Sequence, residues 1–333
     1  MNRRFRWWVA VLLLAGASIP VVLQGRSPES EPGWVTRQIQ DLLSGPGHAV
    51  TIGRLSSSWN LDIVIRDLAI ADDEGVWLNV DQAKLDWEPS ALLRREFRVS
   101  GLDLNRMALE RLPASQPKPS PGRVRLSLPQ GPDLPVGLML QKLTVKRLDL
   151  SATAIGGVAA SLKVEASARL ERGEAGIDAQ LKIDRLDKPG SGKLVMDYSP
   201  QANQFDLDLT VEEPEGGVIA HVGGFPGLPP VHLALRGSGP LVGWQGRLDF
   251  NADRIVRIGA DADIRGVQVT DEAQGYRLTI SADTAFAQLL DRRTATLVGD
   301  SVTFQAEVAV DPNRHIALTP ARVTMAAGTL NLS

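Results

Sequence analysis

The sequence predicts a mostly β protein, in which a long antiparallel sheet curls into a U-shaped apolar groove, with an N-terminal transmembrane helix and one short amphipathic helix. Three observations predict this class. The chain begins with an uncharged apolar run, apolar and polar residues alternate along most segments after residue 49, and few helical segments remain to cover those strands. The 333 residues are 43% hydrophobic and 23% charged, with no cysteine, which excludes a disordered chain and a disulfide scaffold.

The first expected element is a transmembrane anchor over residues 1–25. No charge interrupts residues 7–23, close to the shortest length with which a helix crosses about 30 Å of hydrocarbon. By the positive-inside rule, the basic residues before this run predict a cytoplasmic N-terminus and an exported bulk. These topology residues are Arg3, Arg4 and Arg6, and the anchor residues are Trp7, Trp8, Leu12, Leu13, Leu14, Ile19 and Val22. A cleaved signal peptide stays open, because residues 15–17 have the small-x-small form of a cleavage site.

Residues 26–45 are expected to form a polar connector followed by a short amphipathic helix. Apolar residues between Trp34 and Leu43 recur at spacings of three and four, and Gly45-Pro46 is a helix stop signal. This helix either contacts lipid or closes the end of the following sheet.

The remainder is expected to be β structure in two stretches, 46–112 and 123–333, joined by a Pro-rich linker or loop at 113–122. Turn residues such as Asp73-Glu74-Gly75 separate about eighteen strands. Short helical turns are expected at 89–95 and 282–290. Because residues 329–333 stop within a strand pattern, we expect the chain to be truncated there.

So many strands need to hide one apolar face. Sheets beyond roughly ten strands rarely stay flat and open, so a sandwich, a closed barrel and a trough are all possible. Apolar positions are mostly Leu, Ile and Val, and aromatic residues make up only 5% of the chain, a lining suited to flexible hydrocarbon. The candidate lining residues are Ile63, Ile65, Leu78, Leu85, Trp87, Leu181, Ile183, Phe205, Leu207, Leu209, Leu233, Leu235, Leu278, Ile280 and Phe304.

The sequence offers no catalytic constellation. The four histidines are scattered without metal-ligand spacing, and Asp249-x-Asn251-x-Asp253 lacks the glycine and glutamate of a calcium loop. We therefore expect no catalytic residue, no metal, no cofactor and no enzyme activity. The formal charge of -3 argues against a nucleic-acid partner, which needs a basic face.

Several stretches together resemble the N-terminal part of the TamB family, within the AsmA-like group of bridge-like lipid-transfer proteins. They are residues 50–59, 65–78 and 85–93, with the combination Asp72-x-x-Gly75-x-Trp77 and Leu85-x-Trp87-x-Pro89, together with residues 213–217 and 237–244. The resemblance covers nearly the whole chain, although full-length relatives are several-fold longer.

This resemblance implies a single-pass protein of the bacterial inner membrane with its bulk in the periplasm. Its expected function is to conduct phospholipid between the inner and outer membranes and so to support outer-membrane biogenesis. The implied partners are the membrane, phospholipid and the outer-membrane barrel protein TamA of the Omp85 family, contacted through a C-terminal part that this chain lacks. Two alternatives stay open: a scaffold that assists outer-membrane β-barrel assembly by strand pairing, and a secreted β-sandwich binding module.

Overall fold

The computed structural model describes Gln40, Ser44 and residues 48–57, 62–113, 137–170, 176–240, 243–270, 273–310, 316–318 and 321–332. The expected anchor at 1–25, nearly all of the amphipathic helix and most of the Pro-rich linker lie outside these residues. Within the described part, no helix is both long enough and apolar enough to span a membrane. The mostly β, mostly antiparallel class is confirmed, whereas the U-shaped curl of the sheet stays a prediction.

The chain divides into two compact units, each described separately. The first unit contains most of the N-terminal strands and one 3₁₀ helix, η2 (Pro89–Arg94). Its strands are β1 (Ala49–Ser57), β2 (Ile63–Asp72), β3 (Gly75–Glu88), β4 (Glu96–Leu109), β5 (Gly137–Leu150) and β6 (Ala160–Leu170) up to residue 168.

Strands β1 to β4 of the first unit form successive antiparallel pairs, but β4 and β5 pair in parallel. The sequence analysis expected antiparallel pairing throughout, so this step corrects it. Parallel neighbours need a crossover of a dozen or more residues that returns the chain to the same end of the sheet, and residues 110–136 have that length. The Pro-rich segment therefore lies within the connection between two paired strands.

The expected helical turn after β3 is present as η2. Pro89 starts it, where a missing backbone N–H costs nothing, and Arg95 ends it in the left-handed region with a φ of 57°. Ala91 of this turn is fully buried, and the rings of Trp87 and Phe97, in the strands that the turn connects, lie 5.8 Å apart. Thus η2 covers the end of the β3–β4 pair.

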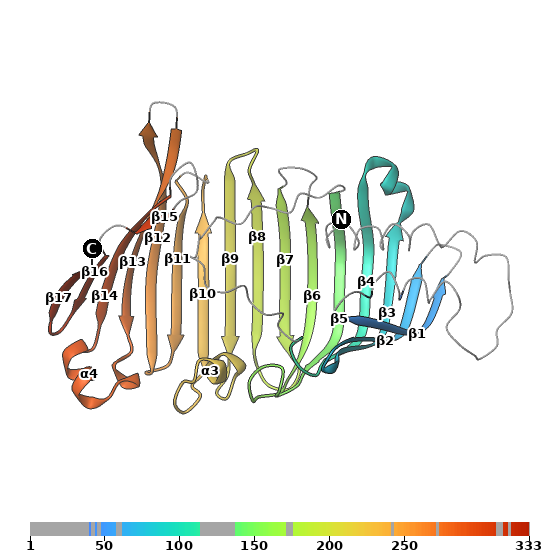
Figure 1. Cartoon of the computed structure of the whole chain (residues 1–333), viewed down its shortest axis with the longest axis horizontal. Helices are drawn as coiled ribbons and strands as arrows, with labels where there is room; N and C mark the ends of the chain where they lie inside the picture. Colours follow the sequence, from blue (N-terminus) through green and yellow to red (C-terminus); the bar gives the residue numbers. More distant parts are fainter. Residues whose placement is uncertain are drawn as a thin grey trace. The chain divides into compact units, whose positions relative to one another are not determined.

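The second unit contains the end of β6 from residue 169, strand β7 (Ile177–Arg185) up to residue 183, and the chain from residue 188 onward. Its strands β8 to β14 run side by side in a single layer of antiparallel neighbours (Figure 1). Their bounds are β8 (Ser191–Ser199), β9 (Gln204–Glu213), β10 (Val231–Ser238), β11 (Gln245–Ala252), β12 (Val256–Thr270), β13 (Ala273–Ala285) and β14 (Val302–Val310).

Short elements complete the second unit. Strand β14 pairs with both β15 (Ile316–Leu318) and β16 (Ala321–Met325), and β16 pairs with β17 (Gly328–Leu332). Helix α3 (Val218–Val222) connects β9 to β10, whereas η3 (Ala287–Leu289) and α4 (Arg292–Val298) connect β13 to β14. The expected turn at 282–290 is thus reduced to η3, because β13 continues to Ala285.

Candidate functional site: an apolar sheet face

Apolar side chains form continuous rows on one face of the second unit. Residues that oppose each other in neighbouring strands project from the same face, so the strand register identifies the members of each row. We call the longest one the central row, and it runs through Leu194, Leu209, Leu235, Leu248, Ala260, Ala282, Phe304, Val323 and Leu330. A continuous apolar stripe therefore crosses the strands at right angles to the chain.

The opposite face of the same strands is charged. Asp208, Arg236, Arg247 and Asp261 form one row there. Arg236 Nε lies 3.7 Å from Asp208 Oδ1, and an Arg247 nitrogen lies 3.1 Å from Asp261 Oδ1. Since these exposed ion pairs contribute little stability, their main effect is to keep this face in water and to define the other face as the apolar one.

Described residues of the second unit place no second sheet over the apolar face. Members of the central row from Leu194 to Phe304 are half-buried, and fully buried side chains concentrate at the ends of the strands. A β-sandwich would bury such positions completely. Within this unit, the arrangement is therefore one layer with an accessible apolar floor.

One edge of this floor is closed by α3 and the loop that follows it. Ala220 of α3 packs with three buried residues on the apolar face of the strand ends, Val231, Ala252 and Val256. The Phe225 ring of the loop lies 6.0 Å from the ring of Phe250. Beneath α3, the apolar face is thus a small dry core and not an open surface.

The other edge is closed by Trp244, which precedes β11. Its ring stacks on Phe205 at 5.5 Å, and its Nε1–H donates a hydrogen bond of 3.0 Å to the Phe205 carbonyl oxygen. The ring lies on Gly237 and Gly246, which oppose each other in β10 and β11, and a Cβ at either glycine would overlap it. Only 8% of Trp244 remains exposed, so this buried aromatic side chain forms the boundary of the apolar floor at this end of the strands.

The first unit carries a similar apolar face with a different spacing. In β5, the apolar face carries Leu140, Leu143, Val145 and Leu148. Two exposed polar residues lie between Leu140 and Leu143 and again between Val145 and Leu148, so these neighbours are three positions apart and not two. Strand β4 matches this pattern, and the parallel register pairs Leu102 with Leu143 and Leu104 with Val145. Because the pairs of polar residues occur at matching positions in β4 and β5, the apolar residues of the two strands stay paired with each other. A strict period of two would not have predicted this spacing.

The structure brings the candidate lining residues together within each unit. In the first unit, Ile63 pairs with Leu85, Ile65 pairs with Ala83, Leu78 pairs with Ile70, and Trp87 pairs with Val99, all on the apolar face. In the second unit, the register places these candidates on the apolar face: Phe205, Leu207, Leu209, Leu233, Leu235, Leu278, Ile280 and Phe304. In β7, Ile183 lies beside Gly192 of that face, and Leu181 is half-buried.

Sequence reasoning missed Leu248, Phe250 and Trp244. The first two stand in an alternating segment, Gly246-Arg247-Leu248-Asp249-Phe250, so the period-two pattern could have identified them. Trp244 had no such signal, because its position depends on two glycines that meet only through the β10–β11 register.

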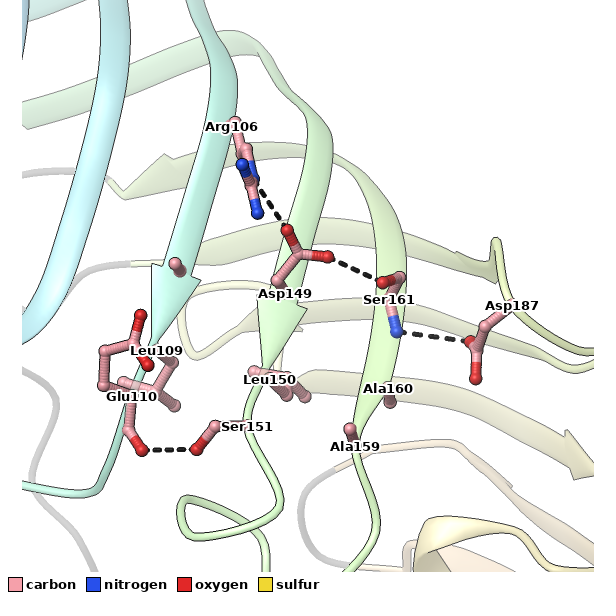
Figure 2. Close-up of a pocket in the computed structure, with 11 residues that line it drawn as sticks. Arg106, Leu109, Glu110, Asp149, Leu150, Ser151, Ala159, Ala160, Ser161 and Asp187 are labelled. Atoms are coloured by element: carbon pink, nitrogen blue, oxygen red, sulfur yellow. Dashed lines mark hydrogen bonds and ion pairs between the residues drawn. The ribbon is translucent and has the colours of Figure 1, made fainter.

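A separate polar pocket of about 350 Å³ lies in the first unit, where β4, β5 and β6 meet (Figure 2). Burial raises the pKa of Asp149, but hydrogen bonds from Ser161, Arg106 and Arg147 outweigh it and hold the pKa at about 2. The Ser161 Oγ–H donates at 2.6 Å and Arg106 Nε–H at 2.8 Å. Because Asp149 of β5 bonds to Arg106 of β4 and to Ser161 of β6, this network ties three strands together. Among the described residues, no group of three or more His, Asp or Glu is placed to hold a metal ion.

A charged face backed by an accessible apolar floor is typical of bridge-like lipid-transfer proteins, which hold lipid along a β-sheet. The chain matches the YdbH-like family, described as intermembrane phospholipid transport protein YdbH, over residues 29–329, and it belongs to that family. Its function is intermembrane phospholipid transport, which implies a location in the cell envelope. No curated protein and no solved structure matched the chain.

The family match refines the resemblance drawn from the sequence. It supports a bridge-like lipid-transfer protein but not TamB specifically, because the matching family is YdbH-like. The expected partnership with TamA depended on the TamB assignment and therefore has no support.

Proposed function

We propose that the apolar face conducts phospholipid acyl chains across the strands, as a passive path without catalysis. The observation that carries this proposal is the central row, which continues without a charged residue from β8 to β17. Head groups would remain in water beside the floor, because the central row offers them no polar side chain.

The energetic reason is the cost of exposing hydrocarbon. Each CH₂ group transferred from water gains roughly 0.8 kcal/mol, so a tail of about fifteen groups costs on the order of 12 kcal/mol to expose. Neighbouring strands lie about 4.8 Å apart, so the six steps from β8 to β14 give an apolar path of roughly 29 Å. Along that path, a chain exchanges one apolar contact for another and avoids most of this cost.

We also propose that residues 1–25 anchor the protein in the inner membrane, with the N-terminus in the cytoplasm and the bulk in the periplasm between the two membranes. The apolar run and the three arginines before it support this topology. Mass spectrometry of the membrane-bound protein tests it, since a mature chain that starts at Ser18 would mean that the segment is a cleaved signal.

Site-specific photo-crosslinking in cells tests the lipid path. A photo-reactive residue at Leu207, on the apolar face, is expected to form phospholipid adducts, whereas one at the exposed neighbour Asp208 is not. The absence of lipid at Leu207 and at other apolar-face positions would refute the path. Adducts with precursors of outer-membrane barrels in place of lipid would instead support an assembly scaffold.

A further inference from the structure

The apolar floor of the second unit narrows where it crosses β10 and β11. Each strand places four residues on this face in succession. They pair across the two strands as Leu233 with Phe250, Leu235 with Leu248 and Gly237 with Gly246, with Val231 and Ala252 at the α3 end. Successive positions on one face of a strand lie about 6.8 Å apart.

Both outer positions of this stretch are covered by protein. At one end, Val231 and Ala252 are 2% and 0% exposed beneath Ala220 of α3, and Phe250 beside them packs against the same cluster. At the other end, the Trp244 ring occupies the space above Gly237 and Gly246. What remains open is the half-buried pair Leu235 and Leu248 and the adjoining side of Leu233.

The floor is wider in the neighbouring strands. In β12 and β13, Ala260 pairs with Ala282, Ala262 with Ile280, and Ile264 with Leu278, and all six residues are half-buried. On the other side, Leu194 and Leu209 of β8 and β9 are half-buried as well. The stretch of β10 and β11, with its outer positions under α3 and Trp244, therefore lies between strands that each place at least three successive half-buried residues on the same apolar face.

We propose that β10 and β11 form a neck one hydrocarbon chain wide, and that Trp244 sets its width as a specificity-determining residue. This inference rests on the proposed lipid path. The open strip spans about 7 Å along the strands, and apolar carbon atoms pack about 4 Å apart, so one chain fits between the two walls and two side by side do not. The two acyl chains of a phospholipid pass this point one after the other, and a chain that ends in a bulky ring is excluded.

The test places a photo-reactive residue on either side of the neck, at Leu209 or at Ile280, in the full-length protein. The probes are an ordinary diacyl phospholipid and one with a pyrene ring at the end of one chain. In the wild type, the ordinary lipid labels both positions, whereas the pyrene lipid labels only one. Trp244→Ala widens the neck, so that the pyrene lipid labels both.

Two further variants complete the test. Trp77→Ala is the control: it removes a half-buried tryptophan of β3 in the first unit and is expected to leave the pyrene lipid on one side only. Leu235→Trp narrows the neck without removing a core contact, so that labelling by the ordinary lipid is lost at one of the two positions. This variant keeps the test decisive if Trp244→Ala does not fold.

Labelling by the pyrene lipid at both positions in the wild type, or unchanged labelling by the ordinary lipid in Leu235→Trp, would overturn the proposed neck. Absence of every lipid from both positions in the wild type would instead overturn the proposed path.

Discussion

Replacing Leu209 by glutamate should expel lipid from the apolar face while leaving the fold intact. Leu209 lies in the central row between Leu194 and Leu235, and its side chain is half-buried. A charged residue in the middle of hydrocarbon costs about 2.5–3.5 kcal/mol, and each 1.4 kcal/mol is a factor of ten. Lipid affinity at this point should therefore fall about 100-fold.

The assay is the phospholipid content of the purified full-length protein, extracted and quantified by mass spectrometry per mole of chain. Thr210→Glu is the matched control, because Thr210 lies on the opposite face, paired with Lys193 and Ala234. It should retain the lipid content of the wild type. If Leu209→Glu keeps its strand content by circular dichroism and also retains wild-type lipid, the apolar face is not where lipid binds.

Three further predictions concern stability. The low pKa of Asp149 stabilises the folded state above about pH 4, and this contribution is lost as the pH falls towards 2. Asp149→Asn should remove this pH dependence of the free energy of unfolding, which urea titrations at several pH values measure. The contribution is about 1 kcal/mol, because the arginine partners of Asp149 are exposed. Glu213 Oε2 accepts a hydrogen bond of 2.7 Å from the Ile219 N–H at the start of α3, so Glu213→Ala, which removes the acceptor, should cost about 1 kcal/mol and speed hydrogen exchange in α3. Val231→Ala should cost about 2 kcal/mol in thermal unfolding, because it opens a cavity under α3; an unchanged midpoint would contradict that packing.

Much of the apolar face was predictable, because the period-two pattern is local. Alternation in Phe205, Leu207 and Leu209 and in Leu233 and Leu235 identified residues that the register then joined into rows. Strand pairing over long distances was not predictable in the same way. The parallel β4–β5 pair depends on the length of a connection whose sequence specifies no pairing.

Edges and exceptions were also beyond the pattern. Helix α3 is only five residues long, too short for a helical period to be visible in the sequence. The aligned double polar positions of β4 and β5, such as Asn105-Arg106 beside Lys146-Arg147, interrupt alternation in a way that has meaning only when both strands are seen together. The finer assignment to TamB has no support, because the family that matches the chain is YdbH-like.

The parallel step between β4 and β5 also sets an order of folding. Neighbouring strands such as β2 and β3, or β8 and β9, are joined by short turns, so each pair can form a hairpin quickly and without the rest of the sheet. Joining β4 to β5 first requires closure of residues 110–136, and closing a connection of this length costs more chain entropy than closing a short turn. The hairpins before the crossover should therefore assemble independently of β5, and their union across it should be the slow event in forming the first unit.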